Sequence, residues 1–158
     1  MDTLPARKHP AHCPPVHRHN RPIIILLTVC IRDRRHLLAH PDVHSALRDT
    51  WAAGTAWNVG TYVIMPDHIH LFCTPMLAES PGPIMQWTGA WKRLASARCP
   101  LLAGQWQRDG WDTQMRNAVH YHRKLEYVRQ NPVRKQLVLH AEEWPYSGCI
   151  RPLHWVSG

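Results

Sequence analysis

The sequence predicts one α+β domain in which helices pack on an antiparallel sheet. A length of 158 residues is that of a single ordinary domain. Hydrophobic residues make up 44% of the chain, which excludes a disordered protein, and β-branched segments alternate with segments of helical spacing. The longest unbroken apolar run, residues 23–27, is far shorter than the ~20 residues of a membrane span, so we expect no membrane partner.

Four segments have the composition of strands. Residues 23–31 are apolar and largely β-branched, which is typical of a central strand covered on both faces. Pro66 and Asp67 alone separate the next two strands, and two residues of turn chemistry predict an antiparallel hairpin. The last strand is expected to include a turn at Asp109 and Gly110. The predicted strands are residues 23–31, 57–65, 68–74 and 105–115.

Three segments have the apolar spacing of helices. In the second, an apolar stripe through Trp87, Trp91 and Leu94 leaves Lys92 and Arg93 outside it. The two tryptophans of this stripe are more typical of a core than of a base-stacking platform. The predicted helices are residues 41–54, 83–99 and 118–130. The order of elements is a split βαβ plan, ferredoxin-like or RRM-like, with helices on one face of the sheet and a further C-terminal helix.

The composition also indicates which kinds of partner the protein can bind and where it is located. Nineteen Lys and Arg against 11 Asp and Glu give a net charge of +8, which is typical of proteins that bind polyanions and also of many that are merely soluble. The five cysteines form no CxxC pair, so we expect reduced thiols and a cytoplasmic location. We expect an irregular arm rich in Pro and His at residues 1–22, one domain at 23–150 and a tail at 151–158.

His68 and His70 lie two residues apart on a predicted strand, so their side chains point to the same face. Two imidazoles ~6–7 Å apart along a strand can bind one metal ion through neutral nitrogens. Such a pair is more often two ordinary polar residues of a sheet. Its position directly after the turn at Pro66 and Asp67 favours a functional role, because turns place side chains at the ends of sheets.

Tyr127 lies on a polar, basic face of the last predicted helix. At ~100° per residue, the apolar stripe of this helix is formed by Tyr121, Leu125 and Val128. The helical neighbours of Tyr127 are instead His120, Arg123, Lys124 and Asn131. A helical tyrosine is usually a core aromatic, and that description suits Tyr121 better than Tyr127.

The positive charge is concentrated around this tyrosine. Between residues 113 and 141 there are six Lys and Arg and one Glu, so 6 − 1 = +5 of the total +8 lies here. A charged run is usually a solvated face, but this concentration is also what a track for a phosphate backbone requires.

Two motifs carry a resemblance to a known family. Residues 65–72 read Met-Pro-Asp-His-Ile-His-Leu-Phe, and residues 127–134 read Tyr-Val-Arg-Gln-Asn-Pro-Val-Arg. Together they resemble the signature motifs of the REP-associated tyrosine transposases, which are single-tyrosine members of the HUH endonuclease superfamily. The resemblance extends to residues 111–116 and 143–147 and covers roughly residues 22–148.

The resemblance implies a role for each motif residue. His68 and His70 would bind a divalent metal ion, with Asn131 completing the site. The precedent of the family implies Mg²⁺ or Mn²⁺, although ligand softness alone would equally allow Zn²⁺. Tyr127 would be the nucleophile that forms a 5′-phosphotyrosine link and frees a 3′-OH. The residues expected to contact DNA are Lys92, Arg93, Arg116, Arg123, Lys124, Arg134 and Lys135.

The implied function is that of a metal-dependent transposase that nicks and rejoins single-stranded repeat or hairpin DNA. The alternative is a DNA-binding protein that has the same fold without catalysis. An RNA-binding module of RRM-like topology would require exposed aromatics on the central strands. The sequence leaves open whether the protein acts as a monomer or as a homodimer.

Overall fold

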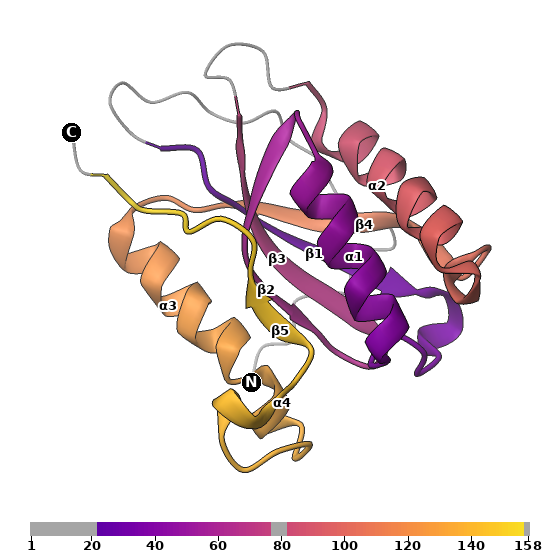
Figure 1. Cartoon of the computed structure of the whole chain (residues 1–158). Helices are drawn as coiled ribbons and strands as arrows, with labels where there is room; N and C mark the ends of the chain where they lie inside the picture. The colour runs from indigo at the N-terminus through magenta and orange to yellow at the C-terminus, as the bar shows by residue number, and fades with distance from the viewer. Residues whose placement is uncertain (1–21, 77–81, 157–158) are drawn as a thin grey trace.

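The computed structural model describes residues 22–76 and 82–156, so residues 1–21 of the expected arm lie outside the described residues. Helices cover both faces of a central sheet (Figure 1). The strands are β1 Ile25–Ile31, β2 Trp57–Ile64, β3 His68–Pro75, β4 Trp106–Gln114 and β5 Ser147–Cys149. The α-helices are α1 Pro41–Ala53, α2 Ile84–Arg98, α3 Ala118–Arg129 and α4 Asn131–Arg134, and the 3₁₀ turns are η1 Arg32–Arg34, η2 Pro100–Leu102 and η3 Ala141–Glu143.

The strands form one sheet in the order β4-β1-β3-β2-β5, and every neighbouring pair is antiparallel. The first four strands have the ferredoxin-like arrangement, so the predicted fold class is confirmed. Sequence patterns did not predict β5, because its three residues are too few to show a period of two. In the described residues, no helix has the length and apolar composition needed to cross a membrane.

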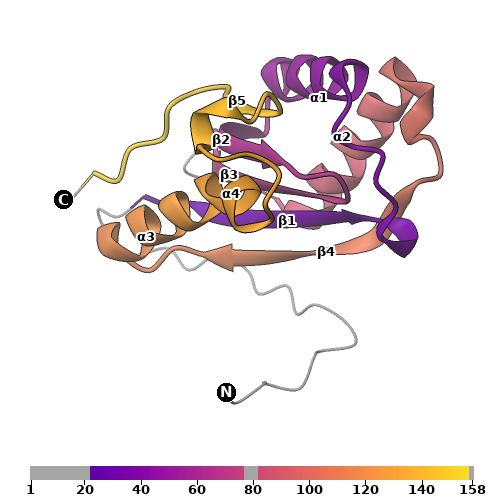
Figure 2. The same cartoon turned by 90° about the horizontal axis from the view of Figure 1, so that it is seen from below.

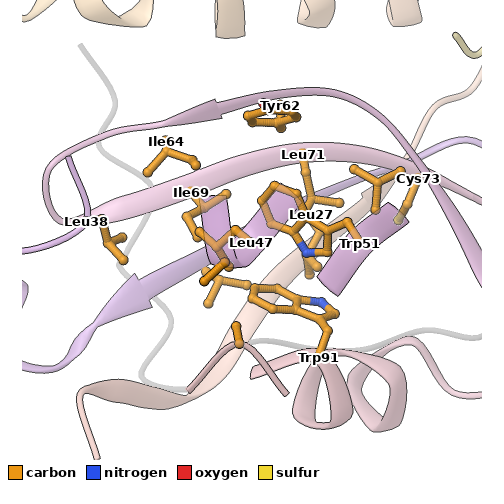
Figure 3. Packing of buried hydrophobic residues seen from close by; sticks show 14 of the residues in the cluster. Leu27, Leu38, Leu47, Trp51, Tyr62, Ile64, Ile69, Leu71, Cys73 and Trp91 are labelled. Carbon is orange, nitrogen blue, oxygen red and sulfur yellow. The ribbon is translucent and has the colours of Figure 1, made fainter. Parts of the chain in front are cut away.

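Helices α1 and α2 cover one face of the sheet and α3 covers the other (Figures 1 and 2). On the α1 and α2 face, Trp51 and Trp91 pack edge to face with ring centroids 5.5 Å apart (Figure 3). On the opposite face, Tyr121 of α3 packs edge to face on Phe72 of β3, with centroids 5.4 Å apart. The two cores bury both faces of the sheet, which stabilises the strands that carry the histidines.

The expected turn at Asp109 and Gly110 is not present, because β4 continues through both residues. Here β4 is bulged against β1: Val29 pairs with Gly110 and Ile31 with Trp106, so β4 advances four residues while β1 advances two. The Asp109 carboxylate accepts a hydrogen bond of 2.9 Å from the Gly110 amide. The Asp-Gly pair therefore marks a bulge in a strand and not a reversal of the chain.

The apolar stripe of α2 differs from the predicted one at Lys92 and Leu94. Lys92 is only 7% exposed and its ammonium donates a 3.0 Å hydrogen bond to the Gln107 carbonyl oxygen of β4, whereas Leu94 is 55% exposed. Burial lowers the pKa of Lys92 from its ordinary value. Its long aliphatic stem packs between α2 and β4, so a residue expected at the surface covers part of the core.

Helix α3 ends at Arg129, as the Asn-Pro pair predicted, but the chain does not leave the helical region there. Gln130 keeps right-handed helical angles, and α4 adds a further turn with Pro132 in its first turn. Proline is tolerated at that position because its amide would have no helical partner. Beyond β5, Leu153 and Trp155 of the expected tail pack against the core under α3.

Candidate functional site

His68 and His70 lie side by side on β3, on the face that α3 covers. Their ring centroids are 4.8 Å apart and the ring planes are nearly perpendicular. β1 lies next to β3, with Thr28 paired to His70 and Cys30 paired to His68. The sequence prediction that the two imidazoles share one face is therefore confirmed.

A hydroxyl on β1 fixes the orientation of His70. The Nδ1 atom of His70 lies 2.8 Å from Thr28 Oγ1. Burial is the main cause that lowers the pKa of His70 to about 3, and the neighbouring His68 and Arg134 lower it further. His70 is therefore neutral at physiological pH. In the tautomer whose Nδ1–H donates to Thr28 Oγ1, the Nε2 atom has a lone pair for a ligand.

An acidic residue and an arginine fix His68 in a similar way. His68 Nδ1 lies 2.6 Å from Asp67 Oδ1, and Arg34 Nε donates a 2.8 Å hydrogen bond to Asp67 Oδ2. Burial lowers the pKa of His68, although Asp67 opposes the shift. Burial alone would raise the pKa of Asp67, but the hydrogen bonds from Arg34 and His68 outweigh it and lower that pKa. A carboxylate on Nδ1 leaves Nε2 of His68 as the nitrogen that can bind a metal ion.

Arg34 reaches this carboxylate from an unusual backbone conformation. Asp33 and Arg34 have φ angles of 56° and 52°, in the left-handed region that residues other than glycine seldom adopt. Such conformations cost about 1–3 kcal/mol each and are concentrated at functional sites. In this conformation Arg34 forms its ion pair with Asp67 beside His68.

Asn131 brings an amide group from α4 to the same place. It is 6% exposed, and its Nδ2 atom lies 3.3 Å from His68 Nε2. A half-turn of the amide exchanges its nitrogen and oxygen, so either an N–H bonds to the imidazole or the oxygen lies beside Nε2 as a third ligand atom.

The side chains present fit a divalent metal ion with a mixed donor set. Among residues 22–76 and 82–156, no group of three His, Cys, Asp or Glu side chains is placed to hold a metal. A site here would therefore consist of His68, His70 and the Asn131 oxygen. Both imidazoles are neutral and held through Nδ1, which is the arrangement found where histidine binds a metal through Nε2.

Tyr127 lies on the solvent side of α3, with its side chain 56% exposed. The guanidinium of Arg134 lies 3.7 Å from the centroid of the Tyr127 ring, and the ammonium of Lys124 lies 5.6 Å from it. Arg134 also donates a 2.6 Å hydrogen bond to the Tyr127 carbonyl oxygen. Both cations lower the pKa of His70, after the larger effect of burial. The tyrosine and the histidine pair therefore share one positively charged environment.

The other predicted DNA contacts fall into two groups. Arg116, Arg123 and Lys135 are exposed at or near α3 and α4. Lys92 and Arg93 instead line a recess of about 470 Å³ between α2 and β4, on the side of the sheet that faces away from α3. The structure thus separates these two residues from the histidines, and contacts from them to DNA would be remote from Tyr127.

Thr28, Asp67 and Arg34 were missed as site residues from sequence. Thr28 interrupts the apolar run 23–31 with a hydroxyl, and Asp67 directly precedes the histidine pair, so both left a weak signal. The Arg34 contact with Asp67 joins residues 33 positions apart, and no local pattern predicts it.

The class of protein whose fold this chain resembles is that of the tyrosine transposases. A solved structure described as a REP-associated tyrosine transposase bound to a REP hairpin has a TM-score of 0.66 and 22% identity, and the match covers 85% of this chain and 82% of that one. The fold described above is therefore the fold of that transposase.

One curated relative is the REP-associated tyrosine transposase of Escherichia coli (strain K12). The chain is 28% identical to it over 109 residues, which is 64% of this chain and 64% of that protein. The chain thus matches less than two thirds of the length of this curated relative. No protein-family model matches the chain. The resemblance that the two motifs predicted is confirmed by the curated relative.

Proposed function

We propose that the protein is a metal-dependent transposase that cuts and rejoins single-stranded DNA beside a hairpin through Tyr127. One observation carries the proposal: two neutral, anchored imidazoles lie opposite a helix whose exposed tyrosine touches Arg134 and Lys124. This combination would supply a nucleophile, positive charge and candidate metal ligands on the α3 side of the sheet, as phosphodiester transesterification requires.

His68, His70 and Asn131 would hold the metal ion, for which we propose Mg²⁺ or Mn²⁺. When bound, such an ion acts as a Lewis acid on a non-bridging oxygen of the scissile phosphate. The contribution of the chain is to fix both imidazoles, since Thr28 and Asp67 occupy the two Nδ1 atoms.

Tyr127 would supply the nucleophile. A bond forms between its Oη atom and the phosphorus, the bond from phosphorus to the 3′-oxygen breaks, and the 3′-oxygen takes up a proton as the phenol loses its own. The products are a 5′-phosphotyrosine and a free 3′-OH, and attack by a 3′-OH reverses the step. Arg134 and Lys124 stabilise the negative charge that develops at Tyr127. No nucleotide cofactor is needed, because the covalent link conserves the phosphodiester bond.

The proposed partner is single-stranded DNA that carries a hairpin, because the structural relative is a transposase bound to a REP hairpin. The cysteines among the described residues, Cys30, Cys73, Cys99 and Cys149, are all free thiols. Free thiols agree with the cytoplasmic location that we propose. A monomer and a homodimer both remain compatible with the proposal.

The decisive experiment is a search for the covalent intermediate. Purified protein is incubated with Mn²⁺ and a labelled DNA hairpin that has a single-stranded extension, and the protein is analysed for a DNA adduct. Tyr127→Phe should abolish the adduct and spare hairpin binding, whereas Tyr121→Phe, a matched change on the same helix, should form it normally. An adduct on Tyr127→Phe would reassign the nucleophile.

The same experiment distinguishes the proposed enzyme from the alternative functions. Absence of any cut or adduct with the wild-type protein would refute the enzyme proposal. Salt-sensitive hairpin binding that survives His68→Ala and His70→Ala would then support a DNA-binding protein without catalysis. The RNA-binding alternative is disfavoured, because Phe72, the aromatic residue of the central strands β1 and β3, is buried under Tyr121.

A further inference from the structure

Trp111 of β4 lies on the same face of the sheet as the two histidines. The register pairs Trp111 with Thr28, and Thr28 with His70, so these residues form one row across β4, β1 and β3. Directly paired residues of antiparallel strands point to the same face. Since neighbouring strands are ~4.8 Å apart, Trp111 stands roughly 10 Å from His70, on the far side of the threonine that orients it.

This part of the face is open to solvent. Trp111 is 43% exposed and is the only exposed tryptophan in the described part of the chain. Thr113, the next residue of β4 on this face, is exposed as well, whereas Phe72 of β3 is buried beneath α3. Helix α3 therefore covers part of the face and leaves the β4 edge uncovered. The packing of the domain does not account for a large aromatic ring at this position.

We propose that Trp111 is a stacking platform for an unpaired base of the DNA strand whose scissile phosphate is bound at His68 and His70. The inference rests on the proposed function and adds a base contact to it. His70 lies two strands away across the sheet from Trp111, and the exposed Arg116 lies two residues beyond the end of β4. The chain thus offers an exposed apolar ring on the face that carries the histidines, with a basic residue near the end of the same strand, and single-stranded nucleic acid is bound by this combination of features.

An exposed tryptophan on an edge strand can also be covered by a second copy of the chain. The charge around the platform favours DNA. Arg116, Arg123, Lys124, Arg134 and Lys135 follow within the next 24 residues of the chain and lie at or near the α3 side of the sheet. Two such surfaces would repel each other, whereas a phosphate backbone would be attracted.

The test measures DNA binding without cleavage. A fluorescein-labelled DNA hairpin with a single-stranded extension of about ten nucleotides is titrated with the full-length protein in EDTA, at several salt concentrations. Trp111→Ala should weaken binding about ten-fold at every salt concentration, because stacking of one base on an aromatic ring has that magnitude and is not ionic. Trp111→Phe should retain most of the affinity, and Leu94→Ala, an exposed apolar change on the opposite face, should bind like wild type.

A base-by-base scan then locates the stacked nucleotide. Each base of the extension is replaced in turn by an abasic site. One position should weaken binding to the wild type by a similar factor and cause no further loss in Trp111→Ala, because the two changes remove the same contact.

The outcomes separate this inference from the proposed function. Equal affinities of Trp111→Ala and wild type would overturn the inference even if the wild type forms the Tyr127 adduct. A ten-fold loss together with the abasic signature would support it even if no cut is observed. Loss of a dimer in Trp111→Ala, with unchanged affinity for DNA per protomer, would overturn it in favour of the second copy.

Discussion

The low pKa of His70 predicts that acid destabilises the metal-free protein through this one residue. The pKa falls from 6.5 to about 3 on folding, so the unfolded chain binds more protons than the native protein between these values. At roughly 1.36 kcal/mol per pH unit, the neutral ring contributes at most about 5 kcal/mol, present above pH 6.5 and lost as the pH falls towards 3. Because the ring is only half-buried, solvent lowers this figure, and we expect about 1–2 kcal/mol to be lost between pH 7 and 5.

The measurement is urea unfolding in EDTA at pH 7, 6 and 5, with wild type and His70→Gln compared at each pH. Gln cannot gain the proton but keeps a polar group opposite Thr28. The variant should be less stable than wild type at pH 7 and should lose less stability on acidification, so that the two curves converge towards pH 5. Parallel pH dependences of the two proteins would refute the conclusion that His70 is the buried group that takes up the proton.

Three further changes test other parts of the structure. Asp67→Asn should weaken Mn²⁺ binding, measured by calorimetry, roughly 10- to 100-fold because it removes the carboxylate from the histidine, and unchanged affinity would make Asp67 a turn residue only. Arg134→Ala should lower the slope of log affinity for single-stranded DNA against log salt by about 0.7, while Arg93→Ala on α2 should not change it. Gly110→Ala would place a Cβ atom 2.8 Å from the Thr28 carbonyl oxygen and should destabilise the fold by about 1–3 kcal/mol in urea unfolding, and a stability equal to wild type would contradict this packing.

The three long helices and the first four strands were predictable from sequence, because each depends on a local period or a local stop signal. The β3 alternation placed His68 and His70 on one face, and the helical stripe through Tyr121 left Tyr127 in a basic environment. The burial of Lys92 was not predictable, because its ammonium bonds to the Gln107 carbonyl oxygen on β4, outside its own helix, and a charged residue by itself indicates the surface.

The partners of the site residues could not be predicted for a related reason. Thr28 and His70 are 42 residues apart, and the hydrogen bond between them exists only in one pairing of β1 with β3. Arg34 reaches Asp67 only because two consecutive residues adopt positive φ angles, a conformation that their side chains disfavour. Local patterns therefore located the candidate ligands, while the groups that orient these ligands depend on tertiary structure.

The register of β4 makes the same point for Trp111. The bulge at Asp109 and Gly110 adds two residues to β4 relative to β1, an even number, so the strand keeps the same alternation on both sides of the bulge. Trp106 accordingly packs in the α1 and α2 core and Trp111 faces the histidines. An insertion of one residue would turn Trp111 towards α2 and present Asp112 beside Thr28. A negative charge there would repel the phosphate backbone, so the proposed site requires this register as well as these residues.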